Sequence, residues 1–426
     1  MVVPMILVFL ILLLIGVPIG MGVGIASWVV LLYNGNFPLT IIAHKMANGV
    51  NSFPLVAVPL FILAGALAGE TSIARRLVRL ADALVGHIRG GLGHVNVVGA
   101  MFFGGISGSA VADAAAIGGL MIPAMVKEGY SSEDAGAITA CSSTLGILIP
   151  PSIPMVLYGV TMGVSIGALF LAGFVPGVLI GCFQMAAVYA IAKKKGWPQR
   201  ERRSSLREVW TAFRAAFLAL LLPVFLLGAI ISGITTATEA GVIGVIYALF
   251  LGGIVYRDYR PSQLYDILLN SAINTAIPCF VVATTSVSAW IIAIERFPDA
   301  LVNFLYSFQL SPIVILLLVN IFLLVVGMFM DLVPALILFA PILYPVVTKA
   351  GVTPIQFGAI LTVNLGIGLV TPPVGNCLYV AAVLAKADLP KMIRAVLPFL
   401  LMNIIGLLLV TYIPAISTFI PSLFYK

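Results

Sequence analysis

Residues 142–154 read S-S-T-L-G-I-L-I-P-P-S-I-P, and residues 363–375 read V-N-L-G-I-G-L-V-T-P-P-V-G. Both stretches lie inside long apolar segments, where adjacent prolines interrupt a helix because proline has no N–H and clashes with the preceding turn. Unpaired backbone groups are costly in hydrocarbon, so such a break is tolerated only where it is buried in protein or faces water. The two stretches therefore predict a pair of broken membrane helices.

The composition is that of a membrane protein. Of 426 residues, 62% are hydrophobic and 9% are charged, whereas about a quarter are charged in soluble domains. Apolar runs long enough to cross a bilayer, about 20 residues each, recur along the chain. These runs are continuous, whereas a β-barrel would need short alternating segments. We therefore expect an all-α polytopic membrane protein.

The charge of +7 gathers in loops rather than on a nucleic-acid-binding face. Seven basic residues lie in KKKGWPQRERRSSLR, residues 193–207, which the positive-inside rule places in the cytoplasm. No cysteine pair forms a C-x-x-C motif, so the four cysteines are expected to be small buried side chains.

Placing this basic loop inside sets the predicted topology. The first apolar segment lacks a basic leader and a cleavage site, so it is interpreted as a retained span. Nine crossings place the N-terminus inside and the C-terminus outside. The expected spans lie near residues 4–32, 50–69, 132–163, 166–192, 209–232, 236–256, 264–294, 354–385 and 395–420.

Two further regions, 92–126 and 312–347, each hold two apolar arms around a Gly-rich turn. Arms of fifteen residues reach only about 22 Å, which favours re-entrant helical hairpins. The alternative is a packed pair of complete spans. An amphipathic stretch typical of an interfacial helix precedes each hairpin, at 70–90 and 295–308.

The two regions belong to an internal repeat. Pro123, Lys127 and Gly129 lie 222 positions before Pro345, Lys349 and Gly351, and the same offset relates the two proline pairs. Five spans separate the hairpins, so the second hairpin enters from the opposite face. We predict a first inverted repeat over 1–192 (hairpin 92–126, broken span 132–163), a basic loop and connecting span over 193–232, and a second repeat over 233–426 (hairpin 312–347, broken span 354–385). Inverted repeats with paired broken helices are the signature of secondary transporters.

The breaks offer the hard oxygen ligands that Na⁺ prefers. Proline frees carbonyls of the preceding turn, and glycine lets that backbone approach an ion closely. The expected cation ligands of the first repeat are Ser107, Ser142, Ser143, Thr144, Gly146 and Pro150. Those of the second repeat are Gly327, Asp331, Asn364, Gly366, Thr371 and Gly375. A proline-kinked packing helix is the alternative for either break.

The restarted helices would present positive dipole ends to an anionic substrate group. The expected substrate-binding residues are Ser107, Ser109, Ser152, Thr371, Pro373 and Asn376. Asp331, at the second hairpin tip, is expected to be neutralised by a cation, because an intramembrane carboxylate is costly. Asp113 is explained equally well by hydrogen bonding to the first turn and by function, and Glu239 by capping a helix.

The sequence motifs give little support for an enzyme. G-I-S-G at 105–108 has the form of an intramembrane serine protease motif, but none of the three histidines follows it to serve as a base. No G-x-x-x-x-G-K-[ST] loop for nucleotide binding is present. We therefore expect a transporter and not an enzyme.

Four segments are distinctive: FFGGISGSAVADAAAIG (102–118), SSTLGILIPPS (142–152), TEAGVIGVIYAL (238–249) and NLGIGLVTPPVGNCLYV (364–380). Together they resemble the large membrane subunit of tripartite ATP-independent periplasmic (TRAP) transporters. The resemblance covers nearly the whole chain. It implies a Na⁺-coupled elevator-type permease of the bacterial cytoplasmic (inner) membrane, with its C-terminus in the periplasm.

The resemblance also implies partners. These are a separate small four-helix membrane subunit and a periplasmic binding protein that delivers an organic acid, of the sialic acid or C4-dicarboxylate type. A stand-alone Na⁺/dicarboxylate symporter of similar symmetry and a passive anion channel are the alternatives.

Overall fold

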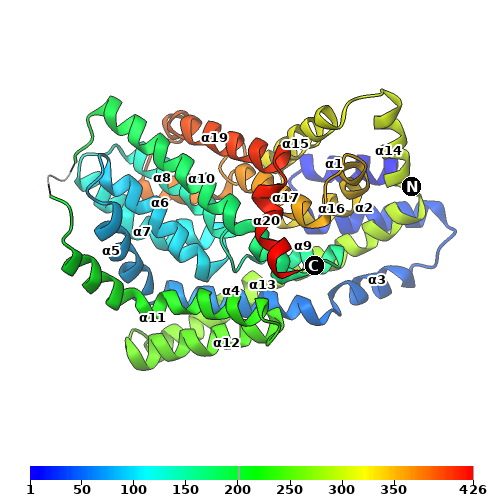
Figure 1. The fold of residues 1–426 in the computed structure, drawn as a ribbon. Helices are drawn as coiled ribbons and strands as arrows, with labels where there is room; N and C mark the ends of the chain where they lie inside the picture. The colour runs from blue at the N-terminus through cyan, green and yellow to red at the C-terminus, as the bar shows by residue number, and fades with distance from the viewer. Residues whose placement is uncertain (200–201, 426) are drawn as a thin grey trace.

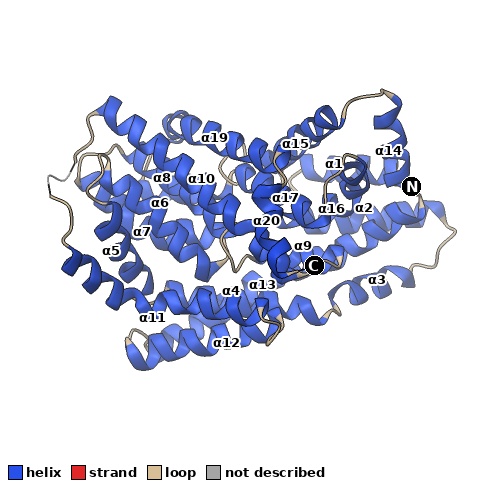
Figure 2. Ribbon diagram, in the orientation of Figure 1, coloured by secondary structure: helices blue, strands red, loops and turns tan. Residues whose placement is uncertain are grey.

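The computed structural model describes residues 1–199 and 202–425, and within this part of the chain there are helices and loops but no strand (Figure 2). The expected all-α fold class is confirmed. Residues 200–201 of the predicted basic loop lie outside the described residues.

Helices of the first half end with the long α10. They are α1 (Val2–Leu14), α2 (Ile19–Asn34), α3 (Thr40–Val50), η1 (Phe53–Val56), α4 (Ala57–Gly69), α5 (Ile73–Val85), α6 (Gly91–Ser107), α7 (Ala110–Lys127), α8 (Ser132–Ser143), η2 (Thr144–Ile147), α9 (Ile153–Met162) and α10 (Ile166–Lys195).

Helices of the second half follow the basic loop. They are α11 (Leu206–Ile231), α12 (Ala237–Leu249), the π-helical turn η3 (Phe250–Val255), α13 (Pro261–Ile294), α14 (Phe297–Ser307), α15 (Pro312–Phe329), α16 (Leu332–Lys349), α17 (Pro354–Gly368), α18 (Asn376–Ala385), α19 (Leu389–Tyr412) and α20 (Ala415–Phe424).

The predicted first span, 4–32, is wrong as a single helix. The chain breaks between α1 and α2, where Gly16 has a φ of +84° and Pro18 precedes the first residue of α2. Gly22 of α2 lies against Phe9 of α1, so the two helices pack side by side. A proline without an N–H, two residues after a glycine with positive φ, makes this turn, which the apolar pattern conceals.

The predicted last span, 395–420, is also interrupted. α19 ends at Tyr412, and α20 begins after Pro414 and packs along α10. In the described residues, eight helices are long and apolar enough to cross a membrane: α7, α10, α11, α12 with η3, α13, α15, α16 and α19. A ninth candidate is α3 with η1–α4, bent by 63°. The chain is multi-pass as expected, but its set of candidate spans differs from the predicted nine.

The hairpin arms are longer than expected. α7, α15 and α16 each have 18 residues and so reach about 27 Å. Length alone therefore does not separate a re-entrant hairpin from two spans. Burial of the first tip favours a re-entrant hairpin, because Ser107 is only 2% exposed and Gly108 is buried.

The elements α5–α10 and α14–α19 follow the same order: a short helix, a hairpin, a broken helix and a closing helix. The hairpins α6–α7 and α15–α16 lie toward opposite ends of the long axis in Figure 1. Packing between the halves is reciprocal, since α9 contacts α16 and α17 while α18 contacts α7 and α8. The inverted relation of the halves stays a prediction.

Small residues hold α2 against the long α13. Gly24 lies directly beside Thr284, and the hydroxyls of Ser27 and Ser288 are 2.7 Å apart. Small side chains allow such close approach between membrane helices, where no hydrophobic force drives association. α13 also packs on α3 and α4.

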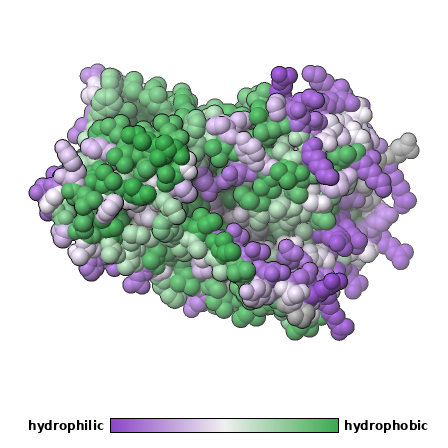
Figure 3. All heavy atoms as spheres, turned by 180° about the vertical axis from the view of Figure 1, so that it is seen from behind, coloured by the Kyte–Doolittle hydropathy of each residue, from purple (hydrophilic) through white to green (hydrophobic). Residues whose placement is uncertain are grey.

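The two predicted amphipathic segments are helical, but their apolar faces differ in burial. α5 buries Ile73, Leu77 and Leu80 in the protein. On α14, Phe304 is 59% exposed, and Phe308, just after the helix, is equally exposed. Hydrophobic residues also cover broad areas of the face in Figure 3, with hydrophilic residues gathered at the right and lower edges of that view.

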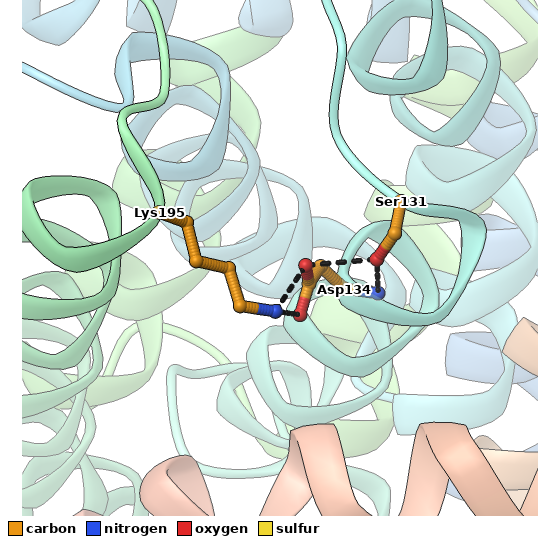
Figure 4. Close-up of polar contacts among 3 residues, drawn as sticks. All are labelled: Ser131, Asp134 and Lys195. Carbon is orange, nitrogen blue, oxygen red and sulfur yellow. Dashed lines mark hydrogen bonds and ion pairs between the residues drawn. The ribbon is translucent and has the colours of Figure 1, made fainter.

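A polar contact ties the end of α10 to the start of α8 (Figure 4). Lys195 Nζ lies 2.7 and 2.6 Å from the two carboxylate oxygens of Asp134, and Ser131 Oγ donates to the same carboxylate at 2.8 Å. The ring of Trp197 packs on Tyr130 with centroids 4.2 Å apart. Burial raises the pKa of Tyr130 to about 12, so its phenol stays neutral. These contacts join the closing helix α10 to the broken helix α8–α9 in the first half.

Replacing Lys195 with Met should lower the thermal unfolding temperature of the purified protein. The Asp134 side chain is 8% exposed and would keep only Ser131 as a side-chain partner, at an expected cost of about 1–3 kcal/mol. Lys194→Met, on the exposed neighbour, is the matched control and should change little. Adding Asp134→Asn to Lys195→Met should restore part of the loss; an equal loss in the double variant would contradict this account.

Candidate functional site

Each half interrupts a membrane helix at its proline pair. In the first, α8 passes into the 3₁₀ turn η2, and α9 restarts with Ser152 as its N-cap. In the second, α17 ends at Gly368 and α18 restarts after Gly375, whose φ is +38°. The Pro150–Pro151 and Pro372–Pro373 bonds are both cis.

Each hairpin tip docks on the break of its own half. The restart residue Ile153 donates its backbone N–H to the carbonyl of Gly108 at 3.3 Å. Val374 donates its N–H to the carbonyl of Met328 at 3.1 Å. The tips thus satisfy backbone groups that the breaks would otherwise leave unpaired inside the protein.

Glycine pairs permit this docking. A Cβ on Gly104 would clash with the backbone of Gly146, and one on Gly368 would clash with the backbone of Gly327. The first pair joins α6 to the first break, and the second joins α15 to the end of α17. Any larger residue would separate hairpin and broken helix.

Buried amides brace each hairpin to its broken helix. Ser142 Oγ donates to Asn96 Oδ1 at 2.8 Å in the first half, and Asn364 Nδ2 donates to Asn320 Oδ1 at 3.0 Å in the second. All four residues are at most 2% exposed. Sequence reasoning missed Asn96 and Asn320, although a polar amide in an apolar hairpin arm was a usable signal.

The other hydroxyls of the first break donate to nearby carbonyls. Ser143 and Thr144 donate to the carbonyls of Ala140 and Cys141, both at 2.7 Å, and Ser152 donates to that of Ile147 at 2.5 Å. Their protons are used in these bonds, while oxygen lone pairs remain to accept from a donor or bind a cation. The Pro150 carbonyl faces Gly105 of α6, at the boundary between hairpin and break.

Asp113 is the main residue of the first tip that was not included among the expected ligands. Ser107 Oγ donates to its Oδ1, and its Oδ2 has no hydrogen-bond partner. The carboxylate fills the space beside Gly146, where a Cβ would clash with it. Ser109 is the N-cap of α7 and accepts from Ala112 N at 3.4 Å. An acid inside an apolar arm, six positions after Ser107, was the available signal.

The second tip carries Asp331 as the N-cap residue of α16. Its Oδ1 accepts from Asn376 Nδ2 at 2.9 Å, which joins the tip to the restart of α18. Thr371 Oγ1 donates to the Ile367 carbonyl at 2.7 Å. Oδ1 of Asn364 lacks a hydrogen-bond partner, as Asp113 Oδ2 does in the first half.

The two breaks meet. Ser143 lies beside Cys377. Ile147 lies against Gly366. A cavity of about 10 Å³, enough for about one water, lies between the two broken helices. Its lining is Thr144, Leu148, Ile180, Thr362, Val363, Gly366, Ile367 and Asn403.

The expected substrate-binding residues are not equally accessible. Ser107 and Ser152 are buried, Pro373 is exposed, and the other three are half-buried. A larger hollow of about 450 Å³ lies between the α9–α10 loop, the α11–α12 loop and Tyr425, and none of the six residues lines it. In the described residues, no group of three His, Cys, Asp or Glu side chains could hold a metal.

Residues 6–416 match the family of the tripartite ATP-independent periplasmic transporter, DctM component. The chain is 39% identical over 411 residues to the isethionate TRAP transporter permease protein DctMQ of Oleidesulfovibrio alaskensis, covering 96% of this chain but 65% of that relative. It is 39% identical to the sialic acid TRAP transporter large permease protein SiaM of Vibrio cholerae, covering 96% of each chain.

Among solved structures, the Alcanivorax borkumensis YdaH transporter has a similar fold. The TM-score is 0.62 at 13% sequence identity, covering 88% of each chain, so this likeness concerns the fold alone. The match over nearly the whole sequence shows that the chain belongs to the DctM family, the large permease components of TRAP transporters, and is a membrane transport protein rather than an enzyme.

Proposed function

We propose that the chain is the large permease subunit of a Na⁺-coupled TRAP transporter that imports an organic acid through the bacterial inner membrane. The observation that carries this proposal is the docking of each hairpin tip on the broken helix of its own half, beside buried oxygens without hydrogen-bond partners. Membership of the DctM family indicates a transporter, and the buried oxygens at the breaks support Na⁺ as the coupling ion.

Two buried acceptor oxygens without hydrogen-bond partners support the binding of a hard monovalent cation. Oδ2 of Asp113 and Oδ1 of Asn364 are buried without hydrogen-bond partners, one in each half. Leaving a buried acceptor unsatisfied costs about 1–3 kcal/mol, more when it is charged. Hydroxyls and freed carbonyls complete an oxygen-only donor set, which suits Na⁺ better than a soft metal. The residues that would hold the ions are those expected from the sequence, with Asp113 added.

The restarts of α9 and α18 support an anionic substrate. Both helices begin at the breaks, so their positive dipole ends lie beside the hairpin tips. The relatives named above carry isethionate and sialic acid in their names, a sulfonate and a carboxylate. Isethionate and sialic acid are both organic acids, so we propose an organic acid as the substrate. The sequence-derived substrate residues remain part of this proposal.

We also propose that the chain works as one component of a three-part transporter. A small four-helix membrane subunit and a periplasmic binding protein would complete the transporter, with the N-terminus of this chain in the cytoplasm and its C-terminus in the periplasm. The hairpins and broken helices of the two inverted repeats would move as one transport domain in an elevator mechanism. At 100 mV each Na⁺ contributes about 2.3 kcal/mol, and a tenfold gradient adds about 1.4 kcal/mol.

Reconstitution in vesicles tests the proposed function. With the small subunit and the binding protein present, a Na⁺ gradient should drive accumulation of one acid from a panel of carboxylates and sulfonates above equilibrium. Uptake by this chain alone would favour a stand-alone symporter. Flux that is independent of Na⁺ and never exceeds equilibrium would contradict active transport and favour a channel.

Asp331→Ala should remove the Na⁺ dependence contributed by the second tip. The change deletes the carboxylate that Asn376 now bonds, so the Na⁺ concentration for half-maximal uptake should rise at least about tenfold. Glu295→Ala, which removes an acid that pairs with the N-terminal amine away from both breaks, is the control. An unchanged Na⁺ response in Asp331→Ala would take this residue out of the site.

Gly146→Ala should abolish uptake, because the added carbon would clash with the Asp113 carboxylate. Gly119→Ala, on α7, has open space around its Cβ position and should retain transport. Transport rates, normalised to the folded protein by size-exclusion chromatography, compare the two. Full activity of Gly146→Ala would show that the carboxylate need not occupy this position.

A further inference from the structure

The helix α11 has an exposed face that is basic and aromatic at its start and apolar farther along. Spacings of three, four and seven residues place five exposed side chains on this one face: Arg207, Trp210, Arg214, Phe217 and Val224. Trp210 is 60% exposed. Only 28% of the most apolar stretch of α11 is buried, the lowest share among the eight candidate spans of the described residues. This face is therefore open to whatever surrounds the protein.

The opposite side of α11 packs on the protein. α11 lies against α5 and α12 along the lower edge of the fold in Figure 1, and it buries Ala216, Ala219 and Leu222. Interfaces between membrane helices are enriched in small residues, because these let two backbones approach. Here two alanines face inward, whereas the exposed face carries arginines and large apolar side chains. That face fits lipid better than another protein helix.

The first turns of α11 carry positive charge that the described residues do not balance. Arg203 and Arg207 lie at the N-terminal end of the helix, where the helix dipole already disfavours cations. Glu208, the acid of this turn, accepts from the Ser205 N–H at 2.6 Å and so serves as a cap. Neither Arg207 nor Arg214 forms an ion pair with a described residue. An anion from outside the chain would offset this charge.

The neighbouring helix α5 adds cations beside the same turns. Arg76 of α5 donates to the carbonyl of Ala215 at 3.5 Å, directly after Arg214 in the sequence. Arg75 and Arg79 of α5 are exposed. The basic surface therefore extends over two packed helices, at the end of α11 that follows the basic loop.

Aromatic rings lie directly beside these arginines. Trp210 and Phe213 are stacked with centroids 5.6 Å apart, and Phe213 contacts Phe217 edge-on at the same distance. Such residues gather at the headgroup level of a bilayer, and the planar fork of arginine binds phosphate through two parallel hydrogen bonds. From Arg207 to Val224 the face runs about 25 Å, which is within the depth of a bilayer. Headgroup chemistry is thus followed by acyl-chain chemistry along one line.

We propose that this face of α11 binds an anionic phospholipid from the leaflet at the basic loop. Arg207 and Arg214 hold its phosphate, and an acyl chain lies along Phe217 and Val224. A zwitterionic lipid offers the same phosphate but also a cation that the arginines repel, so the site selects a headgroup with net negative charge, such as phosphatidylglycerol. The proposal requires neither Na⁺ coupling nor a particular substrate, and so goes beyond the proposed function.

Fluorescence of Trp210 in vesicles tests the lipid class. Bromine atoms on the acyl chains quench a tryptophan in contact with the lipid, and the difference between the native protein and Trp210→Phe isolates this residue among the four tryptophans. Full chains are reconstituted in mixtures of phosphatidylglycerol and phosphatidylcholine, with one or the other brominated. We expect phosphatidylglycerol to be preferred at Trp210 at least about fivefold, as for one cation near an anionic surface.

Charge variants test the arginines. Arg207→Gln combined with Arg214→Gln should bring the preference close to one, whereas lysine at both positions should keep part of it, because lysine retains the charge without the planar fork. Lys391→Gln combined with Arg394→Gln removes the same charge from exposed positions of α19 and is the matched control. It should keep the native preference. Each variant is compared with its own Trp210→Phe form, after size-exclusion chromatography confirms folding.

Equal quenching by both lipids in the native protein would overturn the proposal, as would a native preference in the paired glutamine variant. If that pair does not fold, the two single glutamine variants carry the same test, and a native preference in both would be equally decisive. Loss of quenching by both lipids when the small membrane subunit is added would show that this face is a protein interface, and the lipid assignment would then be wrong.

Discussion

The need to pair backbone groups inside the bilayer constrains the whole architecture. A helix broken by two prolines loses N–H···O=C bonds where water cannot replace them. Here the hairpin tips supply acceptors for N–H groups that lie beyond each proline pair, through Ile153 N–H to the Gly108 carbonyl and Val374 N–H to the Met328 carbonyl. Hairpin and break are therefore interdependent, because each tip pairs a backbone group of its own break.

This dependence accounts for the glycines. Backbone-to-backbone bonding between a tip and a break requires two chains in direct contact, so Gly104 meets Gly146 and Gly327 meets Gly368. The same close contact brings backbone and side-chain oxygens together at the breaks, including the Asp113 carboxylate beside Gly146. The arrangement that satisfies the backbone thus also assembles the proposed cation sites.

Sequence reasoning predicted the features that depend on local chemistry. Proline pairs, Gly-rich turns and apolar run lengths indicated both hairpins, both breaks and the all-helical class, and these correspond to elements of the structure. The turn at Gly16–Pro18 was missed because one proline and one glycine are also tolerated within membrane helices. The break at Pro414 was missed for the same reason. Run length does not distinguish a packed pair of short helices from a single long one.

The candidate site was predicted less completely, because its members depend on contacts between distant segments. The sequence indicates that Ser142 and Asn364 are polar residues in apolar helices, but not that Asn96 and Asn320 bond them from the hairpin arms. Asp113 needed the fold to show that its second oxygen faces Gly146 and lacks a partner. Burial without a partner is a property of the folded chain that no local pattern encodes.

The buried hydrogen bonds of Asn96 and Asn320 also restrict how such a protein can move. Sliding a hairpin along its own broken helix would break Asn96–Ser142 or Asn320–Asn364 and leave those polar groups unsatisfied, at about 1–3 kcal/mol for each. The contact of Lys195 with Asp134 adds the closing helix of the first half to the same unit. The reciprocal packing of α9 and α18 across the halves links the two units to each other. A displacement that carries both hairpins and both broken helices together preserves all of these bonds, as the elevator mechanism proposed above requires.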